Sequence, residues 1–211
     1  MSTGRAEAFS DGVFAIAITL LVLGLVLSGH GPLTSQLLAA WPRYFAYVVS
    51  FLTIGIMWMN HHTILAHVAR VDRPLLVLNL LLLMAVVAVP FPTALVAEHL
   101  TGSSKAAATA TVTYGLVMIA ISAGFAGLWV YVATHAPALG AALPPQALRD
   151  SIPGFTLGGA VYVAGTLIAA LVSALAGLII FGALAVYYLF EHLPSPADEA
   201  EPGAGDGPVG S

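Results

Sequence analysis

Cysteine is absent from the 211-residue chain, and charged residues are scarce, at 8% of the sequence. The missing cysteines exclude disulfide bonds, thiol catalysis and zinc sites built on thiolates. Soluble domains carry about 25% charged residues and need them to cover their surface. With 59% hydrophobic residues, the composition predicts a membrane protein and argues against a soluble enzyme, a nucleic-acid-binding protein or a disordered scaffold.

The few charges are unevenly placed along the chain. The sequence after Leu193 contains no basic residue but four acidic ones, Asp198, Glu199, Glu201 and Asp206. Without these four, the chain has six acidic and six basic residues, so its body is neutral. No basic face is available for nucleic acid, and we expect no such partner.

Five long apolar runs dominate the sequence. A helix needs about 20 residues to cross a hydrocarbon core about 30 Å thick. Four runs predict one span each, at 12–28, 44–66, 75–97 and 106–133. The fifth, at 152–190, is long enough for two spans separated by a break near 173–177. The predicted fold is an all-α polytopic membrane protein with six transmembrane helices in residues 1–192.

The basic residues at the ends of the spans predict the topology. Such residues prefer short cytoplasmic loops, and a cytoplasmic N-terminus places four of the six inside: Arg5, Arg70, Arg73 and Arg149. The other two, Arg43 and Lys105, then lie outside. The first run is not a cleaved signal, because Glu7 and Asp11 precede it and no cleavage site follows. We expect a multi-pass protein of the plasma membrane, surrounded by lipid, with both termini in the cytoplasm.

The segments between the spans and the C-terminal segment differ from the spans in composition. Residues 33–41 are predicted as a short interfacial segment, and 137–145 as a loop rich in alanine and proline. Residues 193–211 combine proline, glycine and acidic residues with almost nothing to bury. Such a composition is typical of disorder, so we expect a disordered acidic tail.

Polar residues lie at the beginning of the first span. Arg5, Ser10 and Asp11 precede an apolar run at 15–21. A carboxylate within the membrane costs a few kcal/mol unless it is paired. A simpler interpretation is that Ser10 or Asp11 caps the N-terminus of the helix. The sequence leaves both interpretations open.

The same span carries a stripe of large apolar residues. Ile16, Leu20, Leu23 and Leu27 recur at helical spacing, and Thr19 lies beside them. Such a stripe is typical of a helix that faces lipid or the core of a bundle. Periodicity alone therefore does not indicate a pore.

The second and third spans contain further polar residues. Trp58, His61 and His62 lie near the end of the second span, and Asn79 lies within the third. Such groups lie at the level of the lipid headgroups or pair inside the bundle. The two histidines point about 100° apart on a helix, unlike the i, i+4 pair of a metal site. We favour a hydrogen-bonded structural role, with Asp11 as a candidate partner.

The remaining motifs have ordinary structural interpretations. Residues 111–115 read TVTYG, similar to the TVGYG filter of potassium channels. The middle glycine is missing and the segment lies inside an apolar run, so we expect a helix and not a re-entrant filter. Pro90 and Pro92 predict an end or a kink in the third run. No motif of a protease, a serine hydrolase or a P-loop is present, so we expect no enzyme.

The polar segment of the first span carries a family resemblance. Arg5-x-x-x-Phe9-Ser10-Asp11, followed by Ala-Ile-Ala-Ile-Thr-Leu-Leu at 15–21, resembles the prokaryotic single-repeat potassium channels of the transmembrane protein 175 family. Trp58, the two adjacent histidines, Asn79 and the Pro-Phe-Pro-Thr sequence at 90–93 are similar to the second and third helices of that family. The rest of the chain matches in hydropathy alone.

The resemblance implies a potassium-selective channel in which four identical subunits surround a pore with their first helices. By position, Ile16 would form the narrow constriction, Thr19 a polar layer, and Leu20 and Leu23 further hydrophobic rings. The polar network between the first three helices would comprise Arg5, Ser10, Asp11, His61, His62 and Asn79. The resemblance implies no cofactor and no metal beyond the permeant potassium ion.

Two other functions remain open. A proton leak or proton-linked carrier would use Asp11 with His61 or His62 as relay sites, because histidine titrates near neutral pH. A subunit without transport activity would instead assemble with a dedicated partner.

Overall fold

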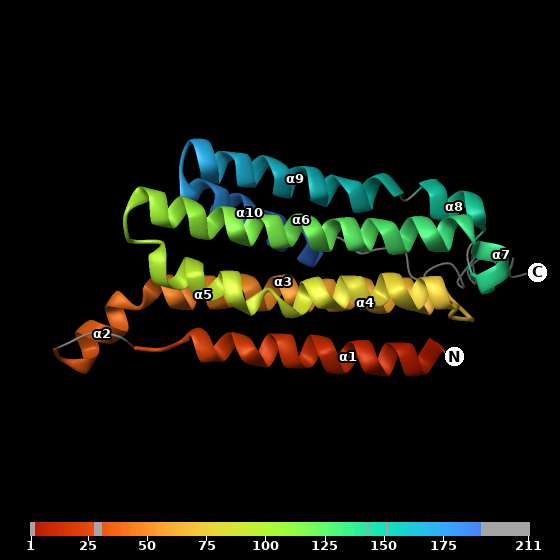
Figure 1. Cartoon of the computed structure of the whole chain (residues 1–211), viewed down its shortest axis with the longest axis horizontal. Helices are drawn as coiled ribbons and strands as arrows, with labels where there is room; N and C mark the ends of the chain where they lie inside the picture. Colours follow the sequence, from red (N-terminus) through yellow and green to blue (C-terminus); the bar gives the residue numbers. More distant parts are fainter. Residues whose placement is uncertain (1–2, 28–30, 143, 151, 191–211) are drawn as a thin grey trace, which may run out of the picture.

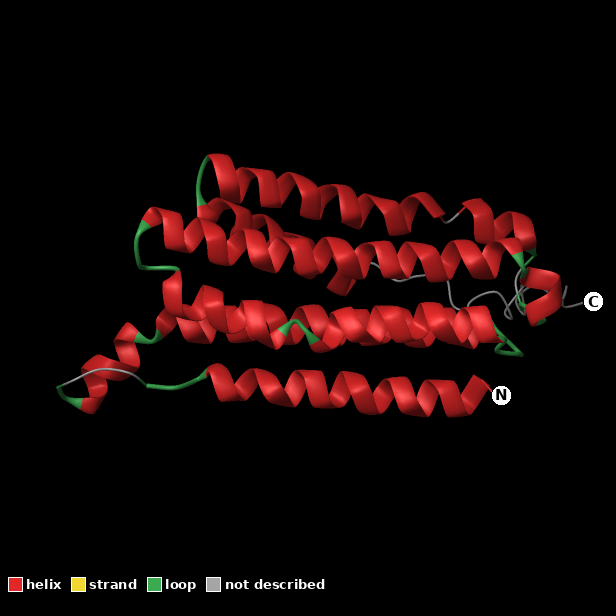
Figure 2. Ribbon diagram, viewed as in Figure 1, coloured by secondary structure: helices red, strands yellow, loops and turns green. Residues whose placement is uncertain are grey.

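The computed structural model describes residues 3–27, 31–142, 144–150 and 152–190 (Figure 1). Helices make up nearly all of these ranges, which contain no β-strand (Figure 2). The helices are α1 (Thr3–Leu20, continued by a 3-10 turn at Leu21–Gly24), α2 (Leu33–Ala39), α3 (Trp41–Ala66), α4 (Arg73–Val87), α5 (Pro90–His99), α6 (Ser104–Thr134), α7 (Ala136–Leu139), α8 (Pro145–Asp150), α9 (Ile152–Leu171) and α10 (Ala174–Phe190). The all-α prediction is confirmed, whereas the predicted tail at 193–211 lies outside the described residues.

Four of the described helical segments are long and apolar enough to cross a membrane: Thr3–Gly24, Trp41–Ala66, Arg73–His99 and Ser104–Thr134. The last apolar run forms two shorter helices, α9 and α10. The chain leaves the helix at 172–173, at the beginning of the predicted break. The count of six transmembrane helices stays a prediction.

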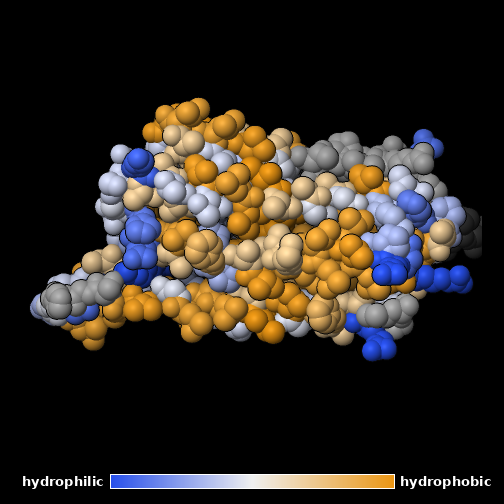
Figure 3. All heavy atoms as spheres, in the orientation of Figure 1, coloured by the Kyte–Doolittle hydropathy of each residue, from blue (hydrophilic) through white to orange (hydrophobic). Residues whose placement is uncertain are grey.

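The long helices lie side by side in layers. In Figure 1, α1 forms one side of the bundle, α3 with α4 and α5 forms the middle, and α6, α9 and α10 form the other side. On the face shown in Figure 3, apolar residues cover the middle and hydrophilic residues gather at the two ends. This distribution is that of a bundle whose axis runs across a bilayer.

Proline divides the third apolar run as predicted. The helix ends at Val87 and resumes at Pro90, with Pro90 and Pro92 in the first turn of α5. Proline has no N–H to continue the helical hydrogen bonds, but its fixed φ angle suits the beginning of a helix. The TVTYG residues at 111–115 lie inside the continuous helix α6, also as expected.

Two boundaries differ from the sequence prediction. The first helix begins at Thr3, well before residue 12. The predicted loop at 137–145 is partly helical, because α7 occupies Ala136–Leu139. Pro137 lies in the first turn of α7, and Gly140 ends it with a φ angle of 62°, a left-handed conformation that glycine adopts without strain.

The turn between α3 and α4 is fixed by Asp72. One carboxylate oxygen accepts a hydrogen bond of 3.0 Å from the backbone N–H of Leu75 and caps α4. The other accepts a hydrogen bond of 2.7 Å from the hydroxyl of Tyr131 near the end of α6. The bond from Tyr131 favours the ionised carboxylate and lowers the pKa of Asp72 from its ordinary value. Asp72 therefore joins two layers of the bundle.

We expect Asp72→Ala to lower the free energy of unfolding by about 1 kcal/mol, because α4 loses its N-cap. The native pKa of Asp72 is lowered, so the stabilisation exists above the pKa of the unfolded chain, about 3.9, and is lost as the pH falls through the native pKa. Thermal unfolding of the purified protein at several pH values measures this difference. Tyr131→Phe, which retains the cap, is expected to cost less. If the difference in stability between wild type and Asp72→Ala does not become smaller in acid, this role of Asp72 is contradicted.

Candidate functional site

Helix α1 has two faces of different character. One face is buried against the bundle and consists of small residues and two larger ones: Ala6, Ser10, Phe14, Ala17 and Leu21. The opposite face is exposed although it is apolar: Ile16 is 58% exposed and Leu23 is 68% exposed. In a water-soluble protein such a face would be unfavourable, so it belongs against lipid or against other subunits.

All four residues predicted to line a pore lie on the exposed side of α1. Ile16, Leu20 and Leu23 point away from the rest of the subunit. Thr19 is also exposed, and its hydroxyl donates a hydrogen bond of 2.9 Å to the carbonyl oxygen of Ile16. This local bond satisfies the hydroxyl proton and leaves the oxygen available as an acceptor.

A chain of hydrogen bonds lies on the buried side of α1. The Ser10 hydroxyl donates to the carbonyl oxygen of Ala6, at 2.9 Å, and accepts from the side-chain amide of Asn79 on α4, at 3.0 Å. The carbonyl oxygen of the Asn79 side chain accepts from Nε2 of His61 on α3, at 2.7 Å. Ser10, His61 and Asn79 are all buried. We call these three residues the buried clamp, because they join α1, α3 and α4.

The buried clamp determines how His61 carries its proton. Because the acceptor is the side-chain oxygen of Asn79, Nε2 of His61 must be the donor. Nδ1 is enclosed and has no hydrogen-bond partner among the described residues. The ring of His61 also packs against Phe14, with 5.3 Å between the ring centroids. The hydrogen bond to Asn79 and the packing against Phe14 therefore hold the His61 ring in one orientation beneath α1.

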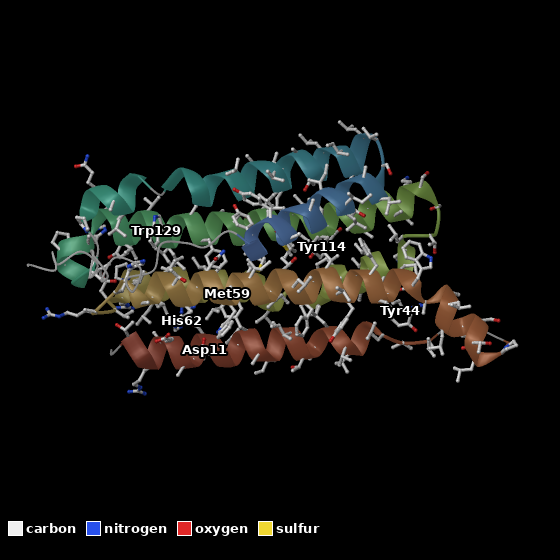
Figure 4. The ribbon with its side chains drawn as sticks, turned by 180° about the vertical axis from the view of Figure 1, so that it is seen from behind. Asp11, Tyr44, Met59, His62, Tyr114 and Trp129 are labelled. Atoms are coloured by element: carbon white, nitrogen blue, oxygen red, sulfur yellow. The ribbon has the colours of Figure 1, made fainter. Side chains whose placement is uncertain are left out.

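Two further contacts join α1 to α3 near the surface. The indole N–H of Trp58 donates a hydrogen bond of 2.8 Å to Asp11, and Nδ1 of His62 lies 2.6 Å from a carboxylate oxygen of Glu7. Figure 4 shows Asp11 and His62 on the facing sides of the two helices. Asp11 thus pairs with Trp58, not with the histidine considered from the sequence.

Arg5 takes no part in the hydrogen bonds of the buried clamp. It is exposed, and the bonds that join Ser10, His61 and Asn79 do not involve it. The sequence analysis treated Glu7 only as a charged residue before the first span and did not predict its contact with His62. Glu7 lies one turn before Asp11 on the same side of a helix, and this spacing could have indicated that it also faces α3.

A second polar cluster, between α3, α5 and α6, was missed in the sequence. The hydroxyls of Ser50 and Thr93 lie 2.8 Å apart, and Ser50 also bonds to the hydroxyl of Tyr114 at 3.2 Å. This cluster holds the broken third span against its neighbours. The described residues contain no group of three histidine, aspartate or glutamate side chains that could hold a metal ion.

The chain is similar to known channels over nearly its whole length. A family model described as the endosomal/lysosomal potassium channel TMEM175 matches residues 5–90. A Streptomyces collinus protein named as a potassium channel is 48% identical over 201 residues, which cover 94% of this chain and 97% of that protein. The human protein named endosomal/lysosomal proton channel TMEM175 is 39% identical over 101 residues, which cover 43% of this chain and 20% of the human protein.

A solved structure has the same fold. It is the crystal structure of a homologue of the lysosomal potassium-selective channel TMEM175 from Chamaesiphon minutus. The two structures superpose with a TM-score of 0.79 at 38% sequence identity, and the match covers 89% of this chain and 96% of the other.

We expect Asn79→Leu to destabilise the protein by about 1–2 kcal/mol, because the substitution leaves Ser10 and His61 without their buried partner. Thermal unfolding in detergent measures the loss. Met84→Leu, at an exposed position of α4, serves as the control and should unfold like the wild type. An Asn79→Leu protein as stable as the control would show that the buried clamp does not hold α1.

Proposed function

The chain belongs to the family of the potassium channel TMEM175, and from this premise we propose that it conducts potassium ions through a pore lined by α1 of each subunit in a homotetramer. The observation that carries this proposal is the exposed apolar side of α1, which contains Ile16, Leu20 and Leu23. In a single subunit this side has no partner among the described residues. Around a symmetry axis, the same side would line a narrow path.

The constriction in this proposal is hydrophobic. Four Ile16 side chains around an axis form a ring that excludes water when it is narrow, and a dry ring is a barrier to ions. Leu20 and Leu23 would form further rings beyond it. A small rotation or outward movement of α1 would widen the rings and let water and ions pass.

Selectivity requires polar groups, and Thr19 supplies them. Its oxygen can accept a contact from a cation or from a water molecule of the ion's hydration shell, because the hydroxyl proton is already bonded to Ile16. Four such oxygens would form a polar layer one turn from the Ile16 ring. We propose that this layer and the width of the Ile16 ring together sort ions by how much water they retain.

The buried clamp sets the rotation of α1 in this proposal. Successive residues of a helix are turned by about 100°, so fixing Ser10 against Asn79 also fixes the direction of Ile16. The clamp thus positions the constriction without touching the ion. The proposal needs no cofactor, and it places the channel in the plasma membrane with cytoplasmic termini.

Proton conduction is the second candidate. The human relative is named a proton channel, and titratable groups bridge α1 and α3 here, through Glu7 with His62 and through Asp11 with Trp58. These groups lie toward one end of α1, whereas the exposed stripe continues along the helix. Potassium conduction through the stripe therefore remains the first proposal.

We expect Ile16→Asn to raise the ion flux and to weaken the preference for potassium over sodium, because a polar ring stays wet. Flux into liposomes that contain the purified protein measures both effects. Ile179→Asn is the matched control, since Ile179 on α10 is the same residue type with a similar exposure, 56% against 58% for Ile16. Equal flux and selectivity in wild type and Ile16→Asn would refute the pore assignment.

The reversal potential distinguishes the two candidate ions. In liposomes with a potassium gradient and no pH gradient, a potassium channel sets the potential near the potassium equilibrium value, whereas a proton channel leaves it near zero. With a pH gradient alone, the expectations are reversed. We expect the potential to follow potassium, and a potential that follows the pH gradient would favour the proton candidate instead.

A further inference from the structure

A partly open crevice lies on the side of α3 that faces away from α1. It is bounded by α3, α6, α9 and α10 and has a volume of about 70 Å³. Most of its lining is apolar, and its large aliphatic and phenyl side chains are Ile56, Met57, Ile121 and Phe125. None of the residues assigned to the proposed pore or to the buried clamp lines it.

Three polar side chains in this crevice lack protein partners. Asn60 of α3, Ser122 of α6 and Tyr162 of α9 all line it. None of the three makes a side-chain hydrogen bond to any other residue in the part of the chain that the structure describes. The Tyr162 side chain is only 7% exposed, and Asn60 and Ser122 are half-buried. Polar groups that are largely shielded from water and have no protein partner favour an occupant that binds them.

The size and chemistry of the crevice narrow the class of ligand. Empty cavities in proteins are apolar, whereas a polar cavity of more than about 10–15 Å³ holds water. A crevice of about 70 Å³ has room for several water molecules or for a hydroxyl group with a few carbon atoms. No charged residue lines it, so an ion would bury its charge without compensation. Apolar walls with a few convergent polar groups are typical of sites for neutral small molecules.

We propose that this crevice binds the hydroxyl head of a small neutral alcohol that dissolves in the bilayer. Tyr162, Ser122 and Asn60 exchange hydrogen bonds with the hydroxyl, and the alkyl chain packs on the apolar walls and leaves through the open side. Tyr162 and Ser122 can each donate or accept, and the Asn60 amide can do both at once. Water occupies the site when no alcohol is present.

Photolabelling of the full-length protein in lipid nanodiscs tests this site. The probe is 1-octanol that carries a diazirine group, with unlabelled 1-octanol as the competitor, and mass spectrometry locates the adducts. We expect saturable adducts on residues of the crevice. Tyr162→Phe and Ser122→Ala should each raise the probe concentration for half-maximal labelling about threefold to tenfold, the effect of one neutral hydrogen bond.

Two further variants complete the test. Ala185→Leu places a larger side chain in the crevice, because Ala185 lines it, and should abolish the saturable labelling. Tyr44→Phe removes a hydroxyl from an exposed position at the other end of α3 and should change nothing. Thermal unfolding verifies that every variant folds. Labelling spread evenly over lipid-facing residues, or saturable labelling that neither Tyr162→Phe nor Ala185→Leu changes, overturns the proposal and leaves a crevice that holds only water.

Discussion

Water does not compete for polar side chains inside a bilayer, which favours hydrogen bonds between such groups within the protein. The hydrogen bonds from Asn79 to Ser10 and from His61 to Asn79 form where α1, α3 and α4 come together. Apolar contacts alone do not determine the rotation of a helix in a membrane, because lipid tails are as apolar as leucine. The hydrogen bonds of the buried clamp determine this rotation, and so they fix which side of α1 faces the rest of the subunit.

The exposed side of α1 follows from the same constraint. Small residues such as Ala6 and Ala17 let α1 lie close to the bundle, while Ile16 and Leu23 lie on its exposed side. A helix that is held by polar contacts on one side and is apolar on the other is suited to line the proposed pore. The hydrogen bonds limit the rotation of the helix, and the apolar side needs no fixed partner. In the proposed tetramer, the conduction path is almost uncharged, which agrees with the low charge content of the whole chain.

The sequence predicts the helices far better than their contacts. Hydropathy and proline placed the apolar runs, because the length of a span and the missing N–H of Pro90 act locally. The partners of polar residues depend on how each helix is rotated, which the sequence does not reveal directly. Asp11 thus meets Trp58 and not a histidine, and Glu7 meets His62. The Ser50–Thr93–Tyr114 cluster escaped notice because hydroxyls in helices often bond to their own backbone, as Thr19 does.

Helix α3 connects the two sides of the subunit through two adjacent residues. His61 faces α1 and α4 in the buried clamp, whereas Asn60 lines the crevice toward α6, α9 and α10. A displacement of the α3 backbone at Asn60 would carry His61 with it, because the two residues are adjacent on one helix. Since Asn79 and Ser10 follow His61 through short hydrogen bonds, such a displacement would reach α1 and the direction of Ile16. In the proposed channel, any coupling between the crevice and the constriction would therefore run through α3 and the buried clamp.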